Sequence, residues 1–202
     1  MNSTVARLFL PLFALAHALL PLQGQTITTN IALGTAVTAS GPWSGVSLST
    51  ITDGTFLPTT THWQSGTVWW NGTGTSFTVA LTGANQITGL KLQADDNDTY
   101  RIEYSLGGGS WTTAWDVPTL GWTGMFTRPN YQDETQWFTL TTPILADSLR
   151  ITATGGDNSY AISEFQVQGI PEAETGMLLL LGLPALFAVR AVRSRKDRSR
   201  AA

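Results

Sequence analysis

Short segments in which apolar and polar residues alternate dominate the middle of this 202-residue sequence. In "TYRIEYSL", Tyr100, Ile102 and Tyr104 fall on one face of an extended strand and the residues between them fall on the other. Segments of this kind, rich in Val, Ile, Thr and aromatic residues, recur about every ten residues between Gly, Pro, Asn and Asp. No part of the body sustains helical spacing. The pattern predicts an all-β fold, a sandwich or jelly roll.

The two ends of the chain differ from this body in composition. Residues 1–24 hold one basic residue, Arg7, followed by the apolar stretch "LFLPLFALAHALLPL", a pattern typical of a cleaved secretory signal peptide. The opposite end, 171–202, carries an apolar segment at 176–192, which is short for a transmembrane helix. We therefore expect one β-domain at 25–170 between a signal peptide and a C-terminal tail.

Basic residues cluster behind the apolar segment of the tail. By the positive-inside rule this end stays in the cytoplasm, so the body is exported while the tail holds the chain transiently in the inner membrane. Six of the eleven Lys and Arg residues of the whole sequence lie here: Arg190, Arg193, Arg195, Lys196, Arg198 and Arg200.

Charge and residue content narrow the function of the body. Between residues 25 and 170 there are eleven Asp and Glu against four Lys and Arg, so nucleic acid is not an expected partner. The chain has no cysteine, so we expect the exported domain to fold without disulfides. His62 is the only histidine of the body, which gives little support to a Ser-His-Asp triad or a histidine-based metal site. We expect no enzyme activity.

Six segments that together cover nearly the whole body carry a family resemblance: "NIALGTAVTAS", "TITDGT", "HWQS", "FTVALTGANQITGLKL", "YRIEYSLGGGSW" and "LRITATGGDNSYAISEFQVQG". Their order resembles that of the F5/8 type C, or discoidin-like, galactose-binding domain. The resemblance implies an eight-stranded jelly-roll β-sandwich. It also implies that the partner is a carbohydrate, and for an exported protein we expect an extracellular polysaccharide or another glycan.

The tail carries a second resemblance. Pro171, Glu172 and Ala173 precede the leucine-rich apolar segment and the basic end. This arrangement is similar to the PEP-CTERM sorting signal of Gram-negative bacteria, although that motif has Pro where this chain has Ala173. The resemblance implies that an exosortase cuts near the motif and releases the body to the cell surface or extracellular matrix. A GPI signal is the alternative, but such signals end in apolar rather than charged residues.

Asp53 lies in a turn sequence, Thr52-Asp53-Gly54, where its carboxylate can accept hydrogen bonds from backbone N–H groups in an Asx-turn. The discoidin-like resemblance implies instead a structural Ca²⁺, an ion that takes six to eight hard oxygens from flexible loops. The implied ligands are three side chains, followed by three backbone carbonyls: Asp53, Ser65 and Glu164, then Thr50, Thr55 and Ser163. The sequence leaves both interpretations open.

The acidic segment "ADDNDTYR", residues 94–101, has spacing similar to half of an EF-hand loop but lacks its Gly and its final Glu. The discoidin-like resemblance implies that this segment forms a rim loop facing a sugar. The alternative is a solvated turn. The candidates for hydrogen bonds to sugar hydroxyls are Asp95, Asp96, Asn97 and Arg101.

All eight tryptophans lie in the body. Four fall in segments that resemble structural positions of the family, and we assign them to packing: Trp63, Trp69, Trp70 and Trp111. Three lie in Gly-, Pro- or Asp-rich segments, where an exposed ring can stack on the apolar face of a sugar: Trp43, Trp115 and Trp122. Trp43 is the preferred candidate, because the resemblance places its loop next to the ligand. The alternative is that its ring covers the core.

Two other functions stay open. The first is a structural biofilm or surface-coat protein whose loops contact other proteins. The second is an ice- or surface-binding protein, suggested by Thr-rich segments such as "LPTTTHW" and "FTLTTP", although these Thr residues are scattered over several strands and loops. The favoured prediction is an exported, non-catalytic β-sandwich that binds carbohydrate.

Overall fold

The computed structural model describes residues 29–171. The predicted signal peptide and almost all of the predicted sorting tail lie outside this range. The described chain contains a 3-10 helix at Leu48–Thr52 and the following strands: β1 (Thr29–Asn30), β2 (Val37–Ala39), β3 (Ser44–Gly45), β4 (Val68–Asn71), β5 (Ser76–Asp95), β6 (Thr99–Ser105), β7 (Thr112–Val117), β8 (Met125–Arg128), β9 (Phe138–Gly155) and β10 (Ser159–Pro171).

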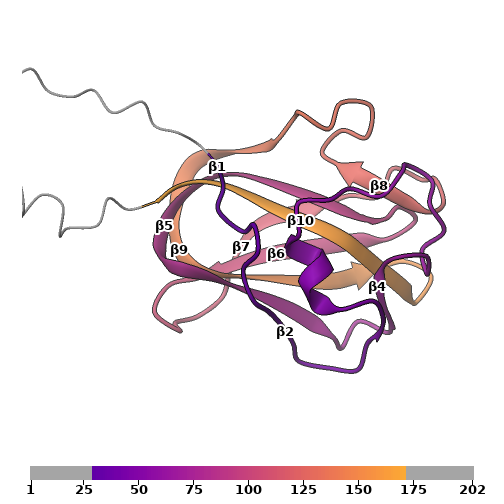
Figure 1. Ribbon diagram of the computed structural model, residues 1–202. Helices are drawn as coiled ribbons and strands as arrows, with labels where there is room; N and C mark the ends of the chain where they lie inside the picture. Colours follow the sequence, from indigo (N-terminus) through magenta and orange to yellow (C-terminus); the bar gives the residue numbers. More distant parts are fainter. Residues whose placement is uncertain (1–28, 172–202) are drawn as a thin grey trace, which may run out of the picture.

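The long strand β5 joins the two layers of the sandwich. It pairs with β2 near its start, with β9 from Ser76 to Leu90, with β10 from Asn85 to Ala94 and with β8 at its end. The register of β5 against β9 shifts between Ala80 and Asn85 and again between Ile87 and Gly89, where the strand bends from one layer to the other. The hydrogen-bonded order is β3-β4-β10-β5-β9-β6-β7, and Figure 1 shows β5 and β9 curving together at one side of the molecule.

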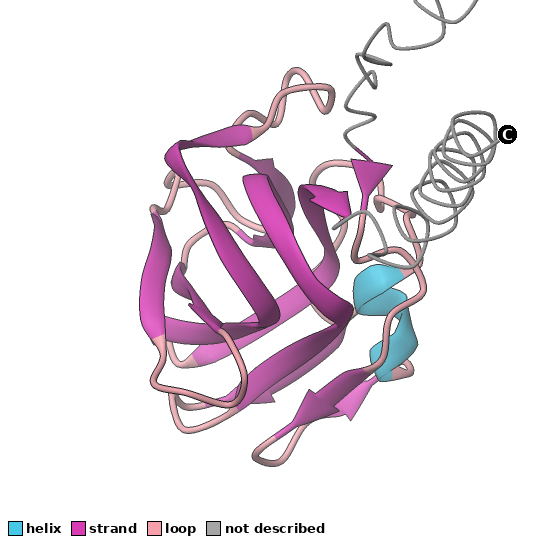
Figure 2. Ribbon diagram, turned by 90° about the vertical axis from the view of Figure 1, so that its left-hand side faces the viewer, coloured by secondary structure: helices cyan, strands magenta, loops and turns pink. Residues whose placement is uncertain are grey.

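Alternation along the strands places the core between the layers. In β5, Phe77, Val79 and Leu81 are buried, as the period-two pattern requires. The predicted all-β sandwich is therefore confirmed. Figure 2 shows the strands enclosing this interior, with the short 3-10 helix packed on the outside near β10.

Trp70 occupies the centre of the core, which agrees with its assignment to packing. Its ring lies 4.8 Å from the ring of Phe77, 5.7 Å from that of Tyr160 and 6.3 Å from that of Tyr100. These contacts join β4, β5, β6 and β10. Each buried aromatic side chain removes a large apolar area from water, so this cluster contributes strongly to the stability of the sandwich.

The other three tryptophans assigned to packing are half-buried. Trp63 and Trp69 meet edge to face at 5.5 Å, and Trp111 lies under the guanidinium of Arg150 at 4.4 Å. They cover the flanks of the sandwich and do not fill its centre.

The first and last described strands lie next to each other. Thr29 of β1 is paired with Gly169 near the end of β10. Of the residues from 29 to 171, none lies in a helix with the length and hydrophobicity that a membrane crossing requires.

Candidate functional site

Three connections meet at one end of the sandwich, and we call this group of residues the loop end: 96–98 between β5 and β6, 118–124 between β7 and β8, and 156–158 between β9 and β10. The first and third are joined by the Asn97 Nδ2, which donates to Asp157 Oδ2 at 2.8 Å. The first and second are joined through buried carboxylates. Segments far apart in sequence thus form one surface.

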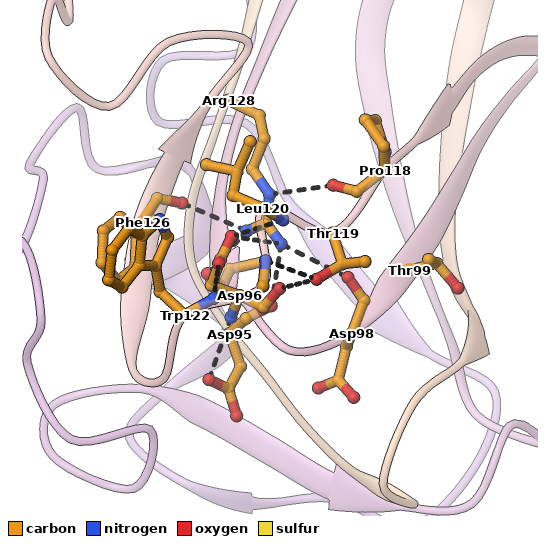
Figure 3. A network of polar contacts seen from close by, with 12 residues as sticks. Asp95, Asp96, Asp98, Thr99, Pro118, Thr119, Leu120, Trp122, Phe126 and Arg128 are labelled. Atoms are coloured by element: carbon orange, nitrogen blue, oxygen red, sulfur yellow. Dashed lines mark hydrogen bonds and ion pairs between the residues drawn. The ribbon is translucent and has the colours of Figure 1, made fainter.

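Asp96 fixes the backbone of the 118–124 loop. Its carboxylate is fully buried and accepts the N–H of Leu120 at 3.3 Å and the N–H of Trp122 at 2.7 Å. The same carboxylate pairs with the guanidinium of Arg128 at 3.3 Å, as Figure 3 shows. Hydrogen bonds to an ionised acceptor inside a protein are strong, so the loop is held in one conformation.

Arg128 organises the interior beneath the loop end. Burial lowers the pKa of its guanidinium, and the surrounding Tyr100 and Asp96 oppose that effect. Each of the three guanidinium nitrogens donates hydrogen bonds. It reaches the backbone carbonyls of five residues from three segments: Ala94, Asp95, Asp98, Pro118 and Phe126.

Asp95 and Asp96 do not lie on the exposed rim where the sequence placed them. Their exposed fractions are 3% and 0%. Asp95 accepts the N–H of Gly124 at 3.1 Å, and burial raises the pKa of its carboxyl group. The expected exposure was wrong because the backbone N–H groups of the 118–124 loop need buried acceptors, and these two carboxylates provide them.

The other two residues predicted to contact sugar have different surroundings. Asn97 lies at the surface turn and contacts Asp157, as described above. Arg101 lies on the outer face of β6, directly opposite Asp116 of β7, and its Nε contacts the Asp116 carboxylate at 2.7 Å. Arg101 is therefore on a sheet face and not in a rim loop.

Asp98 is a buried group of the loop end that sequence reasoning did not single out. Burial raises the pKa of its carboxyl group to about 7, although the N–H of Asp157 at 3.3 Å opposes the shift. Gly156 has a φ of 142°, and a Cβ added there lies 1.8 Å from Asp98 Oδ1. Only glycine fits this turn against the carboxyl group.

The three tryptophans proposed for sugar stacking lie in different environments. Trp122, in the 118–124 loop, is 57% exposed, and Trp43, between β2 and β3, is 37% exposed. Trp115 is only 6% exposed. It lies in β7 opposite Ile102, and its ring stacks on Phe138 at 4.5 Å. The loop assignment of Trp115 was wrong, because strand alternation turns its side chain into the core.

The turn around Asp53 and the strand residue Glu164 are brought together by the fold. Asp53 Oδ1 accepts the N–H of Thr55 at 2.8 Å, which is the Asx-turn that is one of the two interpretations of this sequence. Both carboxylate oxygens of Glu164 accept the N–H of Gly54, at 3.1 and 3.2 Å. Burial raises the pKa of Glu164 to about 8, and the nearby Asp53 adds to the shift.

These residues fit a hard cation in their chemistry. A fully buried carboxylate beside a second carboxylate favours a positive partner, and no ion pair to Glu164 occurs within residues 29–171. Ser163 is adjacent in β10, whereas Ser65 is exposed in the segment before β4. In the described part of the chain, no three Asp, Glu, His or Cys side chains are grouped for metal binding, so a site here depends on backbone carbonyls as well.

The chain has the β-sandwich fold of family 32 carbohydrate-binding modules. It matches the family 32 module of Streptococcus pneumoniae EndoD with a TM-score of 0.50 and 17% identity, over 69% of this chain and 98% of that one. It also matches the family 32 module of C. perfringens NanJ, solved in complex with galactose, with a TM-score of 0.48 and 17% identity, over 70% and 98%. A third match is the chitosan-binding module 1 from the chitosanase/glucanase of Paenibacillus sp. IK-5, with a TM-score of 0.46 and 24% identity, over 69% and 98%.

The sequence matches no family model and no curated protein. At 17% identity the match to the EndoD module defines the fold alone. It confirms the expected jelly-roll, galactose-binding-like architecture of the described domain.

Proposed function

We propose that this protein is a non-catalytic carbohydrate-binding module and that Trp122 provides the ring on which a sugar stacks. The observation that carries this proposal is an exposed indole on a loop whose backbone is fixed by the buried Asp96. Because the backbone of this loop is already fixed, it loses little conformational entropy when a ligand binds to the ring. An indole face is also a good surface for the apolar face of a pyranose.

Polar groups at the same end supply hydrogen-bonding partners. The Asp157 carboxylate is exposed on the turn after β9 and accepts from the Asn97 Nδ2, whereas the Asn97 Oδ1 is buried. A site with an aromatic platform and a few placed polar groups has the composition of a small-molecule site. The fold shared with the EndoD carbohydrate-binding module supports the same class of ligand.

Trp122→Ala is expected to lower affinity for a bound glycan by about tenfold or more, equivalent to about 1.4 kcal/mol. The measurement is a glycan array on the purified protein, followed by titration of any hit. Leu106→Ala is the matched control, because Leu106 is also exposed but lies in the connection between β6 and β7. Unchanged binding by the Trp122 variant contradicts the proposed site. If the folded protein binds no glycan on the array, a structural coat or matrix role is favoured.

We propose that the body reaches the cell surface or extracellular matrix through its tail. The support is the Pro171-Glu172-Ala173 motif, the apolar segment and the basic end of the sequence. Replacing four basic residues with Ala is expected to impair membrane retention and processing, because the positive charge holds this end in the cytoplasm. The residues are Arg190, Arg193, Arg195 and Lys196. Fractionation of cells and medium is the measurement, and an unchanged distribution contradicts the sorting proposal.

We propose that a structural Ca²⁺ binds beside Glu164 and Asp53. The support is the buried carboxylate, its raised pKa and the adjoining turn with its backbone carbonyls. The ion supplies the positive charge that this carboxylate lacks among the described residues. Its expected effect is on stability, since the site joins the 53–55 turn to β10.

A further inference from the structure

A groove of about 540 Å³ lies beside the loop end, between β7, the end of β8 and the start of β9. Its walls are apolar: Trp115 and Phe138 form a parallel stack at 4.5 Å, and Pro118, Leu120 and Pro129 complete them. The volume is in the range of sites that hold small organic ligands. The groove is open to solvent and is not an enclosed cavity.

The rim of the groove is polar. Asp116 and Thr113 lie on β7 and are exposed. The Asp116 carboxylate accepts the Nε of Arg101 through Oδ1, which fixes its orientation at the rim. A ligand suited to this groove therefore has apolar faces and hydroxyl or amino groups along its edge. Pyranose rings combine these two properties.

The groove is continuous with the loop that carries Trp122. Leu120, which forms part of the groove wall, and Trp122 both donate their N–H groups to the Asp96 carboxylate. Two residues of extended chain span at most about 7 Å. The exposed ring and the groove wall therefore belong to neighbouring residues of one loop, and Figure 3 shows Leu120 and Trp122 beside the Asp96 carboxylate.

We propose that this groove is a second subsite, which takes the sugar residues that follow the one stacked on Trp122. The protein then binds an internal stretch of a polysaccharide and not only a single sugar. The inference depends on the proposed carbohydrate-binding function. Because Asp157 is an exposed acid at the loop end, and Asp116 at the groove is already paired with Arg101, the ligand is a neutral or amino sugar chain and not an acidic one.

The test is titration of the purified full-length protein with gluco-, galacto- and glucosamine-oligosaccharides of increasing length. The expected result is an affinity that rises by about tenfold from the single sugar to a plateau, as an adjoining subsite adds contacts. The double variant Asp116→Ala/Thr113→Val is expected to lose most of that rise and to keep its binding of the single sugar. The control is Thr112→Val, which alters an exposed residue of the same strand outside the groove.

Three results overturn the inference. Affinity that does not depend on length leaves the stacking site in place and removes the second subsite. If affinity still rises with oligosaccharide length in the double variant, the additional contacts lie outside the groove. If the folded protein, with an unchanged melting temperature, binds none of the three oligosaccharide series, both the proposed function and the subsite are wrong. Thr113→Val alone gives the same comparison if the double variant does not fold.

Discussion

Arg128→Met is expected to lower the free energy of unfolding by about 3–5 kcal/mol, because it leaves the buried Asp96 carboxylate without its ionic partner. Five backbone carbonyls lose a donor at the same time. For a domain of this size the loss corresponds to a melting temperature lower by roughly 2–4 °C per kcal/mol. Urea denaturation followed by tryptophan fluorescence measures it.

The matched control for this experiment is Arg150→Met. Arg150 forms an ion pair of the same length range with Glu103, at 2.7 Å, but both side chains are partly exposed. Water still reaches this pair, so its loss costs less than leaving the fully buried Asp96 charge unpaired, and this variant is expected to be less destabilised. The double variant Asp96→Asn/Arg128→Met is expected to recover part of the loss by removing the unpaired charge. Equal destabilisation by Arg128→Met and Arg150→Met contradicts the central role of Arg128.

Stability in calcium-free buffer is expected to fall as the pH rises from about 5 to about 8. The pKa of Glu164 is about 8 in the folded protein, above the ordinary value of 4.5. Between these two pKa values, the folded protein keeps a proton on Glu164 that the unfolded chain releases. The contribution of Glu164 to stability is therefore complete below the unfolded pKa of 4.5 and is lost as the pH rises through the folded pKa of about 8. The slope is at most about 1.4 kcal/mol per pH unit for one group.

Calcium is expected to reverse this trend, because the ion binds the ionised carboxylate. At a free concentration 100-fold above its dissociation constant it adds about 2.7 kcal/mol to the free energy of unfolding. Melting temperatures with Ca²⁺ and with EDTA, at pH 6 and pH 8.5, are the measurement. We expect the larger difference at pH 8.5. Identical melting temperatures in the two buffers at both pH values leave Asp53 as a turn cap and remove the calcium proposal.

Two variants separate the groups that titrate in this interval. Glu164→Gln is expected to abolish the calcium response and the part of the decline centred on Glu164. Asp98 also has a raised pKa, about 7, so a decline remains in that variant. Asp98→Asn alone is expected to remove the part of the decline that belongs to Asp98 and to leave both the Glu164 part and the calcium response intact. A calcium response lost in the Asp98 variant instead places the ion at the loop end.

The sequence predicts the sandwich well because strand periodicity directly reflects which residues are buried. Phe77 and Val79 face the core, and Trp70 fills its centre, as the pattern requires. The Asx-turn at Asp53 also follows from local chemistry, since a carboxylate caps the N–H two residues later. Local rules are sufficient for these features.

The loop end could not be predicted in the same way. Asp95 and Asp96 occur in a polar turn sequence, and nothing local shows that Arg128 and the N–H groups of residues 120–124 enclose them. Trp115 and Trp122 occur in similar Gly- and Pro-rich surroundings, yet one is buried in a strand and the other is exposed in a loop. Burial at these positions is decided by contacts between residues distant in sequence.

Because β1 pairs with the end of β10, both ends of the described domain lie next to each other. The chain enters and leaves the described domain at one place, while the 156–158 turn lies at the opposite end of β10. At about 3.3 Å per residue, the thirteen residues of β10 separate the two places by roughly 40 Å. Tethering the domain by either terminus therefore leaves Trp122 and its neighbours facing away from the support. In the proposed carbohydrate-binding role, this arrangement leaves the loop end accessible to polymer in the surrounding medium.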